Sequence, residues 1–122
     1  MKALLVDDFA PILKFEFAIL DQLGFEVSFA SNGKEALTRL QDEPIPDVIL
    51  LDWNMPEMDG MGFIQVVREQ PRFNDVAIIM VTTEIDAEHI SQALTAGANE
   101  YLMKPFDEAC LLDKLRLIRL LA

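Results

Sequence analysis

The chain has 122 residues, of which 52% are hydrophobic, and this length and composition fit one globular domain with a full apolar core. Ten lysines and arginines against 21 aspartates and glutamates give a formal net charge of −11, which argues against direct binding to nucleic acid or to an anionic membrane surface. The single cysteine, Cys110, excludes an internal disulfide, and no apolar run approaches the roughly 20 residues that cross a bilayer. The first residues lack a signal-peptide pattern, so we expect a cytoplasmic protein.

The first part of the chain alternates an apolar run with an amphipathic segment. Residues 3–6 are apolar and lead into Asp7 and Asp8. A helix is predicted over residues 11–23, and it should end at Gly24, which tolerates the left-handed conformation. The residues of this helix that we expect to face the core are Ile12, Phe15, Ile19 and Leu23.

The middle of the chain contains the most apolar of the predicted strands. Residues 25–30 alternate in polarity, which suits a strand near a sheet edge, and a helix follows that ends before Pro44. Residues 48–51 are all apolar and lead into Asp52, a pattern typical of a strand buried on both faces of a parallel sheet. A third helix should follow Gly60.

The last part of the chain repeats the alternation. Residues 76–81 form a second apolar strand that leads into Thr82, and the helix after it should end at Gly97. Residues 100–103 form a short strand, and a final helix is predicted from about residue 107 to the end of the chain. Five strands that alternate with five helices predict an α/β fold with a doubly wound parallel sheet.

Polar side chains stand at the ends of these predicted strands. Parallel strands deliver their last residues to one edge of the sheet, where ligands bind in such folds. The residues brought to that edge would be Asp7, Asp8, Asp52, Thr82 and Lys104. Three carboxylates offer the oxygen ligands that suit Mg²⁺, whereas a lysine and a threonine suit the oxygens of a phosphoryl group. No histidine or cysteine is expected there, which makes zinc a poor candidate.

Taken singly, these residues have ordinary structural interpretations. An aspartate after a strand is more often a helix cap, a threonine at a strand end reflects β propensity, and a lone lysine is usually a solvated charge. Their joint occurrence at successive strand ends favours a functional site.

The complete motifs at the strand ends are Asp7-Asp8, Asp52-Trp53-Asn54-Met55-Pro56-Glu57-Met58-Asp59-Gly60, Met80-Val81-Thr82 and Lys104-Pro105. Together they resemble the receiver domain of two-component response regulators, and the resemblance covers residues 1–122. Within that family, the residues from Asp52 to Pro56 and from Met80 to Thr82 are most similar to those of the single-domain chemotaxis regulators. The resemblance implies a flavodoxin-like receiver fold, with five parallel strands in the order 2-1-3-4-5 and five helices.

The resemblance also implies a phosphorylation site. Asp52 would accept a phosphoryl group from the phosphohistidine of a sensor histidine kinase. Asp8, Asp52 and the backbone carbonyl of Asn54 would bind Mg²⁺ directly, and Asp7 would act through a metal-bound water. The domain would catalyse its own phosphotransfer and autodephosphorylation rather than act as an enzyme on another substrate.

Further roles follow from the same resemblance. Lys104 would contact the phosphoryl group and would form a cis peptide bond with Pro105. Thr82 would move toward the phosphoryl group, and Tyr101 would turn into the space that it leaves. This movement would remodel the face made by the fourth helix, residues 100–103 and the last helix, where a downstream protein would bind.

Four residues flank the acceptor in the resemblance. Asn54 and Glu84 would help to set the rate at which water hydrolyses the acyl phosphate. Thr83 adds bulk beside the site, where the family often has alanine. Trp53 lies next to Asp52 in the chain and should report on events there.

Two features of the chain bear on its output. Flagellar-motor members of the family tend to carry lysines at the positions of Ile85, Asp86 and Ala87, so the downstream target is left open. The last helix has more leucines than one buried face needs, which suggests a homodimer through this helix, a partner groove, or a continuation into an output domain. Its expected core residues are Leu111, Leu115 and Ile118, and the surplus residues are Leu112, Leu117, Leu120 and Leu121.

Three other readings remain beside the free-standing receiver. The chain could be the receiver domain of a longer transcription factor or output enzyme. A metal-dependent phosphatase with an aspartate nucleophile is less well matched, because it needs a carboxylate two residues after Asp52, where the chain has Asn54. A flavin-binding domain is disfavoured because Asp7 and Asp8 would repel a cofactor phosphate.

Overall fold

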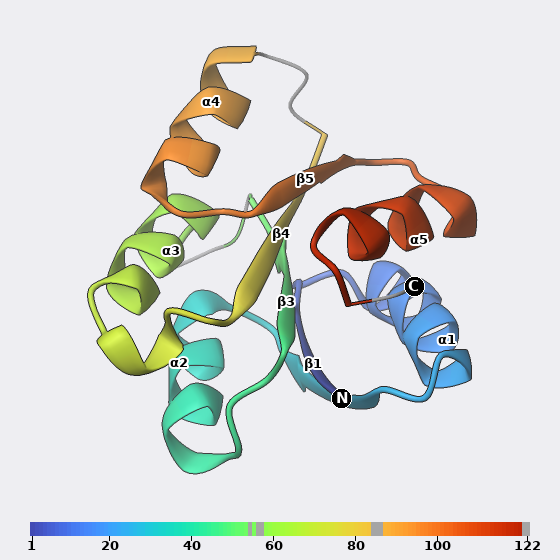
Figure 1. Ribbon diagram of the computed structural model, residues 1–122, viewed down its shortest axis with the longest axis horizontal. Coiled ribbons are helices and arrows are strands. Elements are labelled where there is room, and N and C mark those ends of the chain that lie inside the picture. The colour runs from blue at the N-terminus through green and yellow to red at the C-terminus, as the bar shows by residue number, and fades with distance from the viewer. Residues whose placement is uncertain (54, 56–57, 84–86, 121–122) are drawn as a thin grey trace.

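The computed structural model describes residues 1–53, 55, 58–83 and 87–120. Its elements follow one another in a strand–helix alternation (Figure 1), with a short 3₁₀ turn, η1, before β4. Their bounds are β1 Lys2–Val6, α1 Ala10–Gln22, β2 Glu26–Ala30, α2 Gly33–Asp42, β3 Val48–Asp52, α3 Gly60–Arg68, η1 Pro71–Phe73, β4 Ala77–Thr82, α4 Ala87–Ala96, β5 Glu100–Met103 and α5 Glu108–Leu117.

The sheet has the predicted topology. Five strands lie in the order β2-β1-β3-β4-β5, and each neighbouring pair is parallel. β3 occupies the centre, and all five of its residues are buried. The register pairs Val6 with Leu51, Asp52 with Val81, and Thr82 with Met103. The strands therefore end at nearly the same level, and this brings their terminal residues to one edge.

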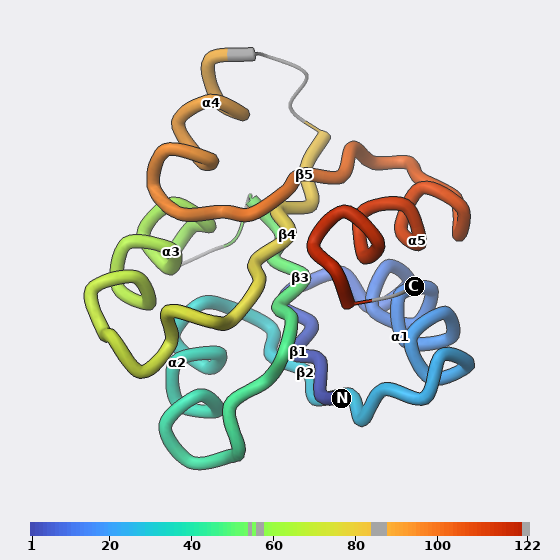
Figure 2. The backbone as a smooth tube through the Cα atoms, viewed as in Figure 1, coloured from blue at the N-terminus to red at the C-terminus, as the bar shows by residue number. Residues whose placement is uncertain are grey.

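Helices cover both faces of the sheet. In Figures 1 and 2, α1 and α5 lie on one face, and α2, α3 and α4 lie on the other. Each face has its own apolar core because alternate residues of the central strands point to opposite sides. Leu5 and Leu50 contribute to the α1–α5 core, and Leu4 and Ile49 contribute to the α2–α4 core on the other face. Within the described ranges, the chain forms no helix that is both long and apolar enough to span a bilayer.

Helix α1 differs from the inward face that we predicted. Phe15 and Leu23 are 40% and 37% exposed, whereas Glu16 is 1% exposed. Ile19 is buried as predicted, and Gly24, with a φ of 90°, reverses the chain after the helix as expected. The apolar spacing was misleading because Phe15 instead packs beside Phe106, with the two rings tilted by 56° and their centroids 5.5 Å apart.

Helix α5 ends earlier than predicted. It stops at Leu117, and Arg119 adopts a left-handed φ of 65°. The Leu120 amide then donates to the Leu115 carbonyl at 2.9 Å, which completes a Schellman motif. This reversal packs Leu120 against the α1–α5 core, so it is not a surplus surface residue. Leu117 is 65% exposed, as expected of a residue outside the core, and Leu121 lies outside the described residues.

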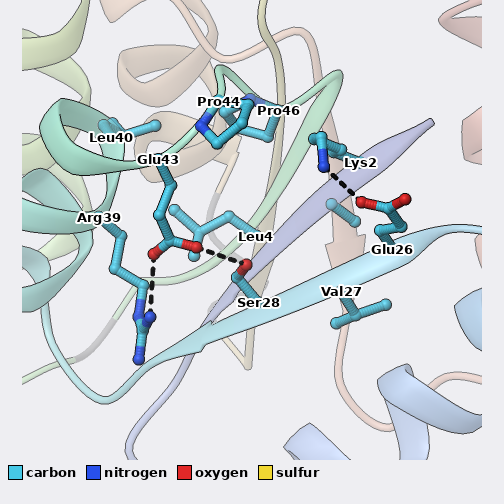
Figure 3. A pocket seen from close by; sticks show the side chains of 11 residues that line it. Lys2, Leu4, Glu26, Val27, Ser28, Arg39, Leu40, Glu43, Pro44 and Pro46 are labelled. Atoms are coloured by element: carbon cyan, nitrogen blue, oxygen red, sulfur yellow. Dashed lines mark hydrogen bonds and ion pairs between the residues drawn. The ribbon is translucent and has the colours of Figure 1, made fainter.

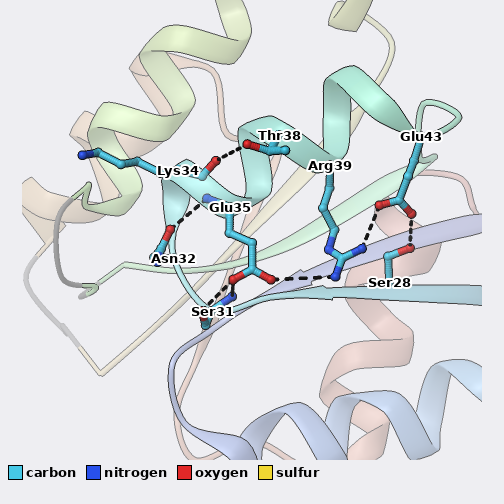
Figure 4. Close-up of polar contacts among 8 residues, drawn as sticks. All are labelled: Ser28, Ser31, Asn32, Lys34, Glu35, Thr38, Arg39 and Glu43. Carbon is cyan, nitrogen blue, oxygen red and sulfur yellow. Dashed lines mark hydrogen bonds and ion pairs between the residues drawn. The ribbon is translucent and has the colours of Figure 1, made fainter.

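Helix α2 is fixed by polar contacts at both ends (Figure 4). The Asn32 side chain accepts a hydrogen bond from the Glu35 amide at 2.8 Å, and the Glu35 carboxylate accepts one from the Ser31 hydroxyl at 2.7 Å. At the other end, Arg39 donates to Glu43 at 2.9 Å. The Asn32 contact satisfies an amide group that the first turn of a helix leaves free.

Candidate functional site

The predicted carboxylates meet at the carboxyl end of the central strands. Asp52 is the last residue of β3 and is 7% exposed, and Asp7, directly after β1, is 1% exposed. Carboxylate oxygens of Asp7, Asp8 and Asp52 all lie within 4.8 Å of one another. Asp8 is exposed, so it opens this cluster to solvent.

The position of Asp7 is set by the local backbone. Its amide donates to the Ala30 carbonyl at 3.1 Å, which extends the pairing of β1 with β2 by one residue. Its carboxylate accepts a hydrogen bond from the Phe9 amide at 2.9 Å. The aspartate thus acts as a local cap at the turn into α1 while its other oxygen faces the cluster.

Lys104 is the cation of the cluster. Its Nζ lies 3.1 Å from Asp7 Oδ2 and 3.1 Å from Asp52 Oδ1. Burial opposes the charged form of the ammonium, but the carboxylates of Asp52 and Asp7 outweigh it and raise the pKa of Lys104. Its peptide bond with Pro105 is cis. The Lys104 amide donates to the Thr82 carbonyl at 2.8 Å, which ties this loop to the end of β4.

The residues present fit a hard divalent cation. Three carboxylates within 4.8 Å of one another carry more negative charge than the single Lys104 ammonium balances. Oxygen ligands of this kind, open to water on the Asp8 side, are those that Mg²⁺ prefers. Asn54, whose carbonyl was predicted as a further ligand, lies outside the described residues.

The predicted switch residues lie on adjacent strands. Thr82 ends β4 and is 1% exposed, and Tyr101 lies in β5, half-buried, where it packs against the α2–α4 core. Met80 of β4 pairs with Tyr101 in the register. Thr83, which was predicted to flank the site, is exposed, and Glu84 lies outside the described residues.

Trp53 is held directly beside the acceptor. It is 9% exposed, and its amide donates to the Val81 carbonyl at 3.1 Å. The Gly60 amide in turn donates to the Trp53 carbonyl at 3.0 Å. A Cβ on Gly60 would lie 3.1 Å from the Trp53 Cα atom, so the start of α3 approaches this backbone closely enough that a side chain at Gly60 would push against it.

Glu16 is the charged residue that sequence reasoning missed. It lies on the buried side of α1, and its pKa is raised to about 8 by burial and by the negative charges of Asp7 and Asp52, against the opposing effect of Lys104. Its side chain is therefore a neutral acid at pH 7. The signal that was available is weak: Glu16 falls between Ile12 and Ile19 or Leu20 in the helical repeat, on the side that faces the sheet.

A separate cavity lies at the opposite end of the sheet, where β1 and β2 begin (Figure 3). It encloses about 200 Å³. Its polar side chains bind one another: Lys2 pairs with Glu26, and Glu43 accepts from Arg39 at 2.9 Å and from Ser28 at 3.2 Å. We assign this cavity no role in the chemistry at the strand ends.

Known proteins are similar to this chain in both sequence and fold. A family model described as the response regulator receiver domain matches residues 3–116. The chemotaxis protein CheY1 of Helicobacter pylori is 40% identical over 119 residues, which cover 97% of this chain and 96% of that protein.

Two solved structures extend the comparison. The chemotaxis response regulator CheY4 of Vibrio cholerae is 38% identical, has a TM-score of 0.89, and is matched over 96% of this chain and 97% of that one. A probable two-component response regulator with a GGDEF domain is 29% identical with a TM-score of 0.89, and it is matched over 97% of this chain but only 48% of its own.

Proposed function

The chain belongs to the response regulator receiver family, and from this premise we propose that it is a signalling switch in which Asp52 accepts a phosphoryl group from a sensor histidine kinase. Receivers like the chemotaxis proteins that it matches are phosphoacceptors that act between histidine kinases and downstream targets. The observation that carries the assignment to Asp52 is its place at the end of the central strand, 3.1 Å from Lys104 and grouped with Asp7 and Asp8.

The proposed reaction uses the groups found at this edge. A carboxylate oxygen of Asp52 attacks the phosphorus of a phosphohistidine in line, so an O–P bond forms as the P–N bond breaks and the imidazole leaves with the electron pair. Lys104 offsets negative charge on the transferring group, and Thr82 offers a hydroxyl to one of its oxygens.

Receiver domains generally bind Mg²⁺, and here Asp8, Asp52, the Asn54 carbonyl and, through water, Asp7 would hold it. When bound, Mg²⁺ supplies positive charge that neutralises and orients phosphoryl oxygens. Water later hydrolyses the acyl phosphate, and Asn54 and Glu84 are proposed to set the rate of this autodephosphorylation.

The energy available is enough for a switch if both polar groups contribute. Inverting a 1:99 equilibrium requires about 5.5 kcal/mol of differential binding. One charge-assisted hydrogen bond contributes about 1.5 to 3 kcal/mol. Contacts of the phosphoryl group with both Thr82 and Lys104 would therefore be needed, each near the upper end of this range, or the resting equilibrium must be less one-sided.

We propose that the readout is the α4–β5–α5 face. Between β5 and α5 lies an open pocket of about 480 Å³ with largely apolar walls that include Met103, Phe106 and Leu117. Leu117 is the most exposed large apolar side chain of this face among the described residues, which supports a protein partner or a second copy of the chain here. Chemotaxis and a cytoplasmic location belong to the same proposal, through the likeness to chemotaxis regulators.

A receiver within a longer protein is the second candidate. The structural match to a regulator with a GGDEF domain supports it, because there the same fold is roughly half of the chain. That residues 1–122 act as one free-standing receiver domain is therefore a prediction, which the native length of the protein would test directly.

The acceptor is tested by mass. Incubation with acetyl phosphate and Mg²⁺ should add one phosphoryl group to the wild type and none to Asp52→Asn, whereas Asp21→Asn, an exposed carboxylate on α1, should react as the wild type does. Equal phosphorylation of Asp52→Asn would overturn the assignment.

Two further measurements follow. Trp53 fluorescence should change with Mg²⁺ and again with acetyl phosphate. Tyr101→Ala should be phosphorylated without gaining affinity for its target.

A further inference from the structure

The half-buried ring of Tyr101 is contacted by a charged side chain of α5. Lys114 Nζ lies 4.4 Å from the centroid of the Tyr101 ring, a cation–π contact. The same ammonium lies 3.0 Å from Glu100 Oε1, and that oxygen also accepts a hydrogen bond from the Tyr101 amide at 3.2 Å. Glu100, Tyr101 and Lys114 therefore form one connected unit that joins β5 to α5.

The Lys114–Glu100 ion pair is less exposed to solvent than an ordinary surface pair. The side chains of Lys114 and Glu100 are 21% and 22% exposed, whereas those of the Arg116–Asp113 pair on the same helix are 52% and 71% exposed. Partial burial strengthens both the ion pair and the cation–π contact because water screens them less. The ion pair with Glu100 already holds the Lys114 side chain in place, so the contact with the ring costs little further side-chain entropy.

We propose that Lys114, anchored by Glu100, is a positioning residue that holds the Tyr101 ring in its half-buried resting position and so sets the resting bias of the switch. This inference rests on the proposed function, in which Tyr101 turns inward when Asp52 is phosphorylated. Because the ammonium covers the ring face, inward rotation must break the contact. A cation–π contact of ordinary strength shifts the equilibrium between ring positions by roughly 2- to 30-fold.

The position of the unit links this bias to partner binding. Tyr101 and Lys114 both line the pocket between β5 and α5, together with Met103 and Leu117. Rotation of the ring would remove one wall of the pocket and leave the Lys114–Glu100 pair at its rim. The same contact thus controls the ring and the shape of the surface that a partner meets.

The single tyrosine of the chain allows a direct test. The full chain is labelled with 3-fluorotyrosine, and the ¹⁹F resonance of Tyr101 is recorded in H₂O and D₂O, because the solvent isotope shift reports how exposed the ring is. Spectra are taken before and after phosphorylation by acetyl phosphate with Mg²⁺, and intact mass gives the fraction phosphorylated. Lys114→Met, Lys114→Arg and Glu100→Gln are compared with Arg116→Met, a matched charge removal on the same helix.

We expect unphosphorylated Lys114→Met to show a smaller isotope shift than the wild type, with a roughly 2- to 30-fold rise in the inward population. Lys114→Arg should restore the wild-type shift, Glu100→Gln should move it in the direction of Lys114→Met, and Arg116→Met should leave it unchanged. Circular dichroism and urea unfolding check that each variant is folded.

Three results would overturn the inference, and they differ from one another. A wild-type isotope shift in Lys114→Met would show that the contact does not hold the ring. No change in the phosphorylated wild type, with the mass gain present, would show that Tyr101 is not the switch although Asp52 is the acceptor. Absence of the mass gain in the wild type would overturn the proposed function itself.

Discussion

Lys104 joins the two buried aspartates of the strand-end cluster, with its Nζ 3.1 Å from Asp7 and 3.1 Å from Asp52. The ammonium therefore lies against two of the three carboxylates that would surround a divalent cation. Lys104 therefore has two opposing effects. It offsets the negative charge of a phosphoryl group at this site, and it competes with a metal ion for the carboxylates.

Lys104→Met should bind Mg²⁺ more tightly and react more slowly. Removing a positive charge beside Asp7 and Asp52 should raise Mg²⁺ affinity by roughly tenfold, and loss of the group that offsets charge should slow phosphorylation by acetyl phosphate by roughly 100-fold. Trp53 fluorescence measures the first and intact mass the second. Lys34→Met, an exposed lysine of α2, is the control for both, and weaker Mg²⁺ binding by Lys104→Met would contradict the prediction.

Glu16→Gln should remove a pH dependence of stability in the metal-free protein. Folding raises the pKa of Glu16 from 4.5 to about 8, so the folded state binds more protons than the unfolded state between these values. The free energy of unfolding of the wild type must then fall as the pH rises from about 4.5 to about 8. The variant should match the wild type near the lower limit and exceed it by on the order of a few kcal/mol above the upper one.

Urea unfolding in the presence of a chelator, followed by Trp53 fluorescence at several pH values, measures this effect. Glu69→Gln replaces an exposed carboxylate and should keep the wild-type slope. A constant difference between Glu16→Gln and the wild type across the range would mean that Glu16 ionises normally.

Arg68→Met should lower the free energy of unfolding by about 2 to 4 kcal/mol. The Arg68 guanidinium, at the end of α3, donates hydrogen bonds at 2.7 to 3.0 Å to four acceptors: the carbonyls of Gly97, Phe73 and Val76 and the side chain of Asn99. These groups lie at the end of η1, just before β4 and in the turn before β5. Arg72→Met loses only a contact with the Phe73 ring, so a loss as large as that of Arg68→Met would contradict this account.

Arg119→Gly should stabilise the protein by about 0.5 to 1 kcal/mol, because glycine adopts the left-handed conformation after a helix without the steric cost borne by Arg119.

Leu120→Ala should destabilise the protein by about 1 to 2 kcal/mol since Leu120 packs on the core. Leu117→Ala should change stability by less than about 0.5 kcal/mol. Thermal unfolding compares the three, and a large loss in Leu117→Ala would place that leucine in the core.

Strand positions and the membership of the site could be predicted from the sequence for a physical reason. A strand buried on both faces must be a continuous apolar run, so residues 48–51 and 76–81 identify β3 and β4 without tertiary information. In a parallel sheet the residue after each run is carried to a common edge. Asp7, Asp52 and Lys104 meet there as that rule predicts.

Helix faces could not be predicted as well, because which side of a helix is buried depends on what it packs against. Phe15 fits the apolar stripe of α1 but lies beside Phe106 at the surface, while Glu16 is enclosed near the carboxylates. The end of α5 escaped prediction because Arg119, unlike glycine, gives no sign that the chain will turn there.

The sequence by itself determined the order of strands and helices, the family and the group of polar residues at one edge of the sheet, since these depend on local runs and on the parallel arrangement. Only the tertiary structure decided that Glu16 is buried as a neutral acid, that Leu120 returns to the core, and that Lys114 covers Tyr101. Each of these depends on side chains from different elements meeting at a few ångströms, and a pattern along a single segment carries no information on such meetings.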